Sequence, residues 1–100
     1  IVCAGENVFP AEVEDLISGH PGVIEATALG VEDKEWGHRL RAFVVRAEHA
    51  VELDEATIKT YVKENLARYK VPRDVVFLDE LPRNPTGKIL KRELRERYPD

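Results

Sequence analysis

The feature that most constrains the fold is a change in the spacing of apolar residues within the first third of the chain. Val13, Leu16 and Ile17 are spaced by three and four residues, which is the period of a helix with one apolar face. After Val23, the apolar residues Ile24, Ala26 and Ala28 alternate with Glu25 and Thr27, which is the period of a β-strand with one buried face. A helix followed at once by a strand predicts a sheet that is covered by helices.

Turn-forming residues set the limits of this first helix. Pro10 suits the first helical position, because its missing N–H would have no partner there. Gly19 and Pro21 end the helix. Gly5 lies in a turn between two short apolar pairs, so we expect a short β-hairpin before the helix.

The remaining elements are predicted by the same two periods. They are a second strand through Val45 that pairs with the first, a helix from the N-cap Asp54 to Val71-Pro72, a short buried strand at 75–78, a loop at 82–88, and a helix that buries Leu90 and Leu94. We therefore expect an α+β fold, with a small central sheet of about three strands, flanking helices and the preceding short hairpin.

Length and composition limit the chain to one domain. It has 100 residues, of which 43% are hydrophobic and 34% are charged, enough for one modest core. No apolar stretch is long enough to span a membrane, and no signal-peptide pattern precedes the first strand. Because the chain starts at Ile1 without a methionine, we expect it to be part of a longer polypeptide.

Cysteine and histidine give no indication of metal chemistry. Cys3 is the single cysteine, so we expect no internal disulfide, and a reducing, cytoplasmic setting is favoured. His20, His38 and His49 do not have the spacing of metal ligands, so we predict no metal site.

The net charge of −4 conceals a gradient along the chain. Residues 1–35 contain eight acidic residues against Lys34, whereas residues 83–100 contain six basic residues against three acidic ones. The basic end could contact phosphate or an acidic partner, or it could be a solvated helix face. A stand-alone module that binds nucleic acid or an acidic protein through its basic C-terminal helix is the alternative from another class. The acidic first third and the lack of an aromatic-rich RNA-binding strand argue against it.

Lys88 ends a loop, residues 82–88, that is punctuated by proline and glycine. Pro82 and Pro85 restrict the backbone, while Gly87 permits unusual dihedral angles, so the tip of the loop could adjust. The loop is not a P-loop, because Pro82 stands where the first glycine is required and Ile89 replaces the magnesium-binding Ser or Thr. Local chemistry alone leaves open whether Lys88 binds an anion or is a solvated surface residue.

Three other positions have both a functional and a structural interpretation. Trp36, in a polar connection, could stack on a ligand or belong partly to the core. Arg73, near Tyr69, could bind phosphate, although bases are also favoured at the end of a helix. Gly5 could be an ordinary turn glycine or could allow a ligand to pass close by.

Five motifs in a fixed order resemble one family. They are residues 5–14, Trp36-Gly37, residues 42–45, residues 69–72 and residues 82–88. Over essentially its whole length, the chain resembles the C-terminal domain of adenylate-forming enzymes, which include acyl-CoA synthetases, luciferases and peptide-synthetase adenylation domains. It is most similar to the fatty-acyl-CoA synthetase branch.

The resemblance implies a mobile lid, residues 1–100, on a larger enzyme. The N-terminal domain would hold ATP, Mg²⁺ and the carboxylic acid, and the hinge would precede Ile1. Lys88 would assist attack of the carboxylate on the α-phosphorus of ATP, on a loop made flexible by Gly87. After the lid rotates, a second face would serve thioester formation with CoA. The isolated domain would be inactive.

The same resemblance assigns residues to the CoA step. Gly5 would line the pantetheine tunnel, Trp36 would lie near pantetheine, and Tyr69 and Arg73 would lie near the CoA nucleotide. The chain departs from the family pattern at Cys3, Ala4, His38 and Val71. These departures concern the detailed contacts with CoA and not the family. Within the family, an enzyme with a different acceptor, such as the pantetheine of a carrier protein, is the alternative.

Overall fold

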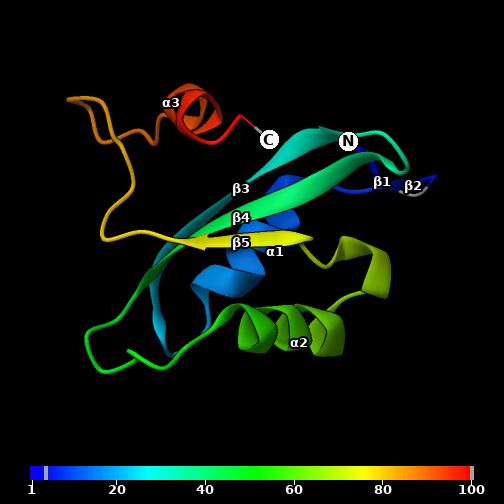
Figure 1. Ribbon diagram of the computed structural model, residues 1–100. Coiled ribbons are helices and arrows are strands. Elements are labelled where there is room, and N and C mark those ends of the chain that lie inside the picture. The colour runs from blue at the N-terminus through cyan, green and yellow to red at the C-terminus, as the bar shows by residue number, and fades with distance from the viewer. Residues whose placement is uncertain (4, 100) are drawn as a thin grey trace.

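A sheet with helices on both faces organises the chain, which the computed structural model describes at residues 1–3 and 5–99 (Figure 1). The strands are β1 (Val2–Cys3), β2 (Glu6–Asn7), β3 (Val23–Asp33), β4 (Gly37–Arg46) and β5 (Asp74–Phe77). The helices are α1 (Pro10–Ser18), α2 (Glu55–Asn65) and α3 (Lys91–Arg97), with a 3₁₀ turn, η1, at Arg68–Lys70. The predicted α+β fold is confirmed, with the small hairpin β1–β2 ahead of the main sheet.

Strand β4 lies at the centre of the sheet. One edge pairs with β3 in a long antiparallel hairpin that runs to the Asp33–Gly37 pair. The other edge pairs with β5 in parallel, from Arg41–Asp74 to Val44–Phe77, and with β1 at Gly37. The hairpin β1–β2 and strand β5 therefore lie along the same edge of β4.

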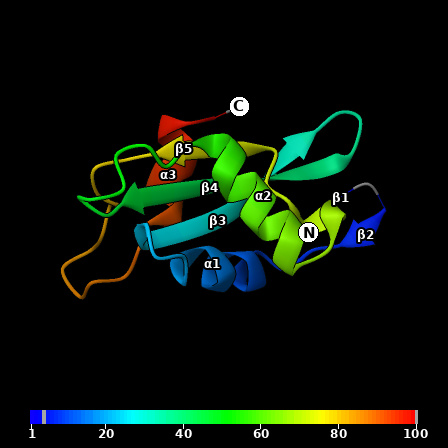
Figure 2. The same cartoon turned by 90° about the horizontal axis from the view of Figure 1, so that it is seen from below.

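The two faces of the sheet carry separate apolar cores. Helices α1 and α2 cover one face and α3 covers the other (Figure 2). Leu40, Ala42 and Val44 point to the first core, whereas Phe43 and Val45 point to the second. Because side chains alternate along a strand, β4 can be buried on both faces only if both cores are filled.

Local sequence explains how the two longer helices begin. Pro10 occupies the first turn of α1, as predicted. At the start of α2, the Oδ1 atom of Asp54 accepts a hydrogen bond of 2.9 Å from the backbone N–H of Thr57. This bond satisfies one of the free N–H groups of the first helical turn and confirms Asp54 as the N-cap. No helix in the described part of the chain is long and apolar enough to cross a membrane.

Three sequence predictions were wrong in detail. Helix α2 ends at Asn65 rather than at Val71-Pro72, because Leu66 is extended and the chain turns so that Leu66 and Val71 pack on the first core. Ile24 is 60% exposed, because a bulge between Val23 and Glu25 shifts the alternation. Strand β5 is only half-buried, since it forms an edge of the sheet.

Candidate functional site

The candidate residues fall at two opposite ends of the molecule. The loop that carries Lys88 projects from the end of the sheet ahead of α3, whereas Trp36 lies in the β3–β4 turn at the other end, beside the β1–β2 hairpin (Figures 1 and 2). Two separate candidate sites follow from this arrangement: an acceptor pocket near Trp36 and a lysine loop at Lys88.

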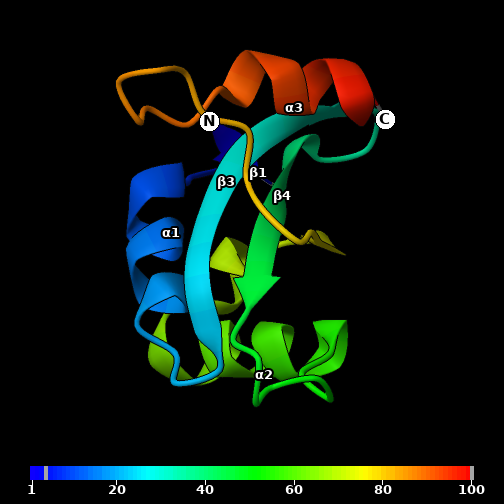
Figure 3. The ribbon, with the colours of Figure 1, turned by 90° about the vertical axis from the view of Figure 1, so that its left-hand side faces the viewer.

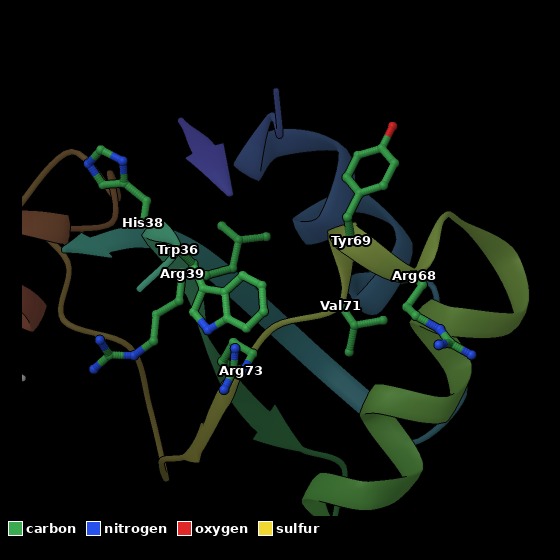
Figure 4. Close-up of a pocket in the computed structure, with 8 residues that line it drawn as sticks. Trp36, His38, Arg39, Arg68, Tyr69, Val71 and Arg73 are labelled. Atoms are coloured by element: carbon green, nitrogen blue, oxygen red, sulfur yellow. The ribbon is translucent and has the colours of Figure 1, made fainter. Parts of the chain in front are cut away.

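The acceptor pocket has a volume of about 480 Å³ and unites three of the predicted residues (Figure 4). Trp36, Tyr69 and Arg73 line it together. The sequence analysis did not assign the other lining residues to a site. These residues are His38, Arg39, Leu40, Arg68 and Val71. Two of them, His38 and Val71, are departures from the family pattern. The wall is mainly apolar and aromatic, with arginine side chains at its margin, as is common in sites for small organic ligands.

Asp33 holds the turn that presents Trp36. Its Oδ1 atom accepts hydrogen bonds of 2.9 Å from the backbone N–H groups of both Glu35 and Trp36. The bond from Trp36 is the main reason that the pKa of Asp33 lies below its ordinary value. Gly37 completes the turn at φ +85°, and a Cβ atom there would lie 3.3 Å from the carbonyl oxygen of Val2. The turn conformation and the adjacent hairpin therefore both favour glycine after the tryptophan.

The opposite wall of the pocket is fixed by contacts of the segment between α2 and β5. The Nζ atom of Lys70 lies 2.6 Å from the Oε1 atom of Glu12 on α1, and this hydrogen bond raises the pKa of Lys70. The backbone N–H of Arg73 donates to the carbonyl oxygen of Leu40 at 3.0 Å. Tyr69 is 40% exposed, as is Trp36, so both rings remain accessible.

Asp74 anchors β5 below the pocket through two arginines that sequence reasoning missed. Its Oδ2 atom accepts hydrogen bonds of 3.0 Å from the Nε atoms of Arg39 and Arg41. Burial alone would raise the pKa of Asp74, but the hydrogen bonds and charges of the two arginines outweigh it and lower the pKa. The alternation of Arg39 and Arg41 along one face of β4 was the available signal, but their partner could not be read from local sequence.

Gly5 lies outside the lining of the acceptor pocket. It is in the β1–β2 hairpin with φ +83°, and, apart from its two chain neighbours, no described residue has an atom within 4 Å of the position that a Cβ atom would take. The backbone conformation explains glycine here, because residues with a side chain rarely adopt it. Of the departures near this hairpin, Ala4 lies outside the described residues.

The lysine loop is a closed hairpin rather than a freely extended segment. Arg83 forms an antiparallel bridge with Ile89, and the backbone N–H of Asn84 donates to the carbonyl oxygen of Lys88 at 3.0 Å. Gly87 has φ +89°. The Lys88 side chain is exposed, and its Nζ atom makes no hydrogen bond or ion pair within residues 1–3 and 5–99. A cation in this position is available for a group outside the domain.

Comparison with known proteins identifies the class. The sequence matches the AMP-binding enzyme C-terminal domain family over residues 12–88. It is 49% identical over 98 residues to the long-chain-fatty-acid–CoA ligase FadD13 of Mycobacterium tuberculosis, covering 98% of this chain and 19% of the ligase. It is 47% identical to the fatty acid–[acyl-carrier-protein] ligase ScoC of Streptomyces coeruleorubidus, with the same coverage. ATP-bound MatB from Rhodopseudomonas palustris superposes with a TM-score of 0.92 at 40% identity, over 100% of this chain and 20% of that structure.

These matches define an enzyme domain of the adenylate-forming ligases. The chain belongs to the family of C-terminal domains of AMP-binding enzymes. It spans about a fifth of the length of the curated relatives that it matches.

Proposed function

We propose that this chain is the mobile C-terminal lid of an acyl-CoA synthetase that activates a carboxylic acid with ATP and transfers the acyl group to CoA. The single observation that carries the proposal is the position of Lys88 and the acceptor pocket at opposite ends of one small domain (Figures 1 and 2). Two half-reactions with different co-substrates need two different faces, and a rotating lid can present them in turn.

Lys88 serves the first half-reaction. The attacking carboxylate and the α-phosphate of ATP are both anionic, so a positive charge between them stabilises the transition state. Acyl-adenylate and pyrophosphate are the products. The Lys88 side chain is exposed on a projecting loop and has no carboxylate partner among the described residues, which suits this role.

The acceptor pocket serves the second half-reaction, in which the CoA thiol attacks the acyl-adenylate and AMP leaves. Trp36 and Tyr69 offer aromatic surfaces for the pantetheine arm and the nucleotide, and Arg73 offers a donor for phosphate. Gly5 lies at the same end of the molecule, where a residue without a side chain would leave room for the thiol once the N-terminal domain completes the tunnel.

The N-terminal domain completes the proposed enzyme. It would bind ATP and the acid, and it would also hold Mg²⁺, because the described residues contain no cluster of three or more His, Cys, Asp or Glu side chains suited to a metal ion. A fatty acid is the proposed substrate class, since FadD13 and ScoC both act on fatty acids by name. The use of ATP and CoA agrees with the cytoplasmic setting expected from the lone cysteine.

A Lys88→Ala variant of the full-length enzyme tests the proposal. Loss of a preorganised charge should lower ATP–pyrophosphate exchange by about 10²–10³-fold. Thioester formation from supplied acyl-adenylate should stay within about threefold of the parent enzyme, because the acceptor pocket is intact. Lys63→Ala is the matched control, because it removes an exposed lysine that lies on α2, away from the loop. It should change neither rate. Equal loss in both half-reactions would refute the assignment of Lys88 to adenylation alone.

A carrier protein is the second candidate acceptor, because ScoC is a ligase for acyl-carrier protein. The pantetheine arm is common to CoA and to a loaded carrier protein, so the aromatic wall of the pocket suits both. Supplying CoA and a loaded carrier protein in separate reactions, and measuring which thiol is acylated, distinguishes the two acceptors.

A further inference from the structure

We propose that Asn84 is a positioning residue for Lys88, and that an ion pair between Arg83 and Glu25 fixes the lysine loop to the sheet. This inference rests on the proposed function, because it concerns how the domain delivers the Lys88 charge. The loop leads directly into α3 (Figure 3). In this arrangement the backbone of the loop is preformed on the lid, and only the lysine side chain remains free.

Asn84 bonds to both backbone polar groups of Lys88. Its backbone N–H donates to the carbonyl oxygen of Lys88 at 3.0 Å, and its Oδ1 atom accepts from the N–H of Lys88 at 2.9 Å. The same Oδ1 atom accepts from the N–H and the hydroxyl of Thr86, at 3.1 and 2.8 Å. One amide oxygen therefore organises the whole tip of the loop, which is the local bonding that favours asparagine in turns.

Arg83 connects this tip to the body of the domain. One of its terminal nitrogens donates to the carbonyl oxygen of Gly87 at 2.6 Å, and the other lies 2.6 Å from the Oε2 atom of Glu25 on β3. The planar guanidinium group can make both contacts at once because its donors point in fixed directions. The position of Gly87, next to Lys88, is thereby tied to strand β3 of the sheet rather than left to the loop alone.

This rigid support matters because lysine is long and flexible. A charge that stabilises a transition state must be in place before the reaction, and a displacement of about 1 Å can cost about 10²-fold in rate. With its backbone bonded on both sides, Lys88 has only its own side-chain torsions to order. Asn84 touches no substrate in this proposal and acts through Lys88.

Substitutions at Asn84 in the full-length enzyme separate positioning from simple stability. Asn84→Leu keeps the size of the side chain and removes the acceptor oxygen. We expect kcat for ATP–pyrophosphate exchange to fall about 10–50-fold with KM for ATP within twofold, and thioester formation from supplied acyl-adenylate to be unchanged. Asn84→Asp, a separate single variant, keeps an acceptor oxygen in place, so its kcat should be within about threefold of that of the parent enzyme. Asn65→Leu, at an exposed asparagine on α2, is the matched control and should leave every rate unchanged.

The Arg83–Glu25 contact is tested by a cycle of Arg83→Gln, Glu25→Gln and the double variant. If the pair acts as a unit, each single variant should lower the exchange rate about 3–10-fold. The exchange rate of the double variant should then be no lower than that of the less active single variant. Independent, multiplying losses would overturn the ion pair as the fixing contact.

Two results with Asn84→Leu would each overturn the role of Asn84: an exchange rate within twofold of the parent enzyme, or equal losses in both half-reactions. Failure of Asn84→Asp to restore the rate would do the same. Lys88→Ala in the same assays keeps this outcome separate from failure of the proposed function. If Lys88→Ala lowers exchange by about 10²–10³-fold while Asn84→Leu leaves it within twofold of the parent enzyme, the function stands and the positioning role is wrong.

Discussion

Arg73 lies over the indole ring of Trp36, with its Cζ atom 5.4 Å from the ring centroid. Trp36 directly precedes β4 and Arg73 directly precedes β5, and the two residues meet at the same end of the sheet because β5 runs parallel to β4. Figure 4 shows the arginine beside the ring at the margin of the acceptor pocket. A cation held against one part of the ring leaves the remaining aromatic surface and the arginine donors available to one ligand.

Substitution of Trp36 should impair the CoA step alone. Loss of an aromatic contact of about 1–2 kcal/mol corresponds to a rise of about 5–30-fold in KM for CoA in a Trp36→Ala variant. ATP–pyrophosphate exchange should remain within twofold, because Lys88 lies at the other end of the domain. Steady-state kinetics with CoA as the varied substrate, combined with exchange assays, measures both effects.

Phe9→Ala is the control for this experiment. Phe9 is an aromatic residue that is 66% exposed, but it does not line the acceptor pocket. Its removal should leave KM for CoA within twofold of the parent value. An equal effect of Phe9→Ala and Trp36→Ala would indicate a general surface effect and contradict the assignment of the pocket to CoA.

The effect of replacing Gly87 should depend on how readily the new residue adopts a positive φ. Its φ of +89° is unfavourable for alanine by about 1–2 kcal/mol, whereas asparagine enters the left-handed region more readily. Apart from the two chain neighbours of Gly87, no described residue has an atom within 4 Å of an added Cβ, so strain rather than collision decides the outcome. We expect Gly87→Ala to lower ATP–pyrophosphate exchange about 3–10-fold and Gly87→Asn to lower it less. Equal losses in the two variants would instead favour flexibility as the reason for glycine.

Local patterns predicted most of the elements of this fold. The helical period at Val13, Leu16 and Ile17 and the N-cap Asp54 each depend on residues within one or two turns, and both predictions were confirmed. The bulge that exposes Ile24 depends on the pairing of β3 with β4, and the end of α2 depends on how Leu66 packs against the core. Such tertiary contacts cannot be read from the spacing of neighbouring residues.

The candidate site was predicted residue by residue but not as an arrangement. Family motifs indicated Trp36, Tyr69 and Arg73 separately, and only the parallel pairing of β4 with β5 brings them into one pocket. Asn84 was missed although the order Asn-Pro-Thr-Gly is a turn signal. Its bonds to Lys88 depend on the exact geometry of the closed loop.

Asp74 should stabilise the domain in a pH-dependent way. In the folded chain the carboxylate accepts hydrogen bonds from Arg39 and Arg41, and the side chain of Arg41 is 7% exposed. Asp74→Asn removes the carboxylate that the two arginines share, although Arg39 keeps its ion pair with Asp33. This change should lower the free energy of unfolding by about 1–3 kcal/mol at pH 7. Urea unfolding of the 100-residue chain followed by circular dichroism measures this difference.

The pH dependence follows from the direction of the Asp74 shift. The pKa of Asp74 is lower in the folded chain than its ordinary value of 3.8, because the arginine contacts outweigh the effect of burial. The stabilising contribution is therefore complete above the ordinary value and is lost as the pH falls through the lower, folded pKa. The gap in stability between the parent chain and Asp74→Asn should accordingly narrow below pH 3.8. If the difference in free energy of unfolding stayed constant as the pH fell well below 3.8, the ionised Asp74 carboxylate would not be its source.

Leu94 should be the residue on which the attachment of α3 depends most. Helix α3 has seven residues, which is too short to be stable by itself, so packing must hold it on the sheet. Leu94 is fully buried in the second core, and Arg95 adds a hydrogen bond of 2.7 Å to the carbonyl oxygen of Gly30. Leu94→Ala should lower the free energy of unfolding by about 2–4 kcal/mol.

Val51→Ala is the control for this measurement, because Val51 is 73% exposed and its truncation should change stability by less than about 0.5 kcal/mol. Urea unfolding of both variants gives the comparison directly. Because residues 82–90 lead straight into α3, hydrogen exchange of their amides should also become faster in Leu94→Ala and stay unchanged in Val51→Ala. Equal stability of the two variants would show that the second core does not hold the helix, and that the lysine loop is supported from β3 alone.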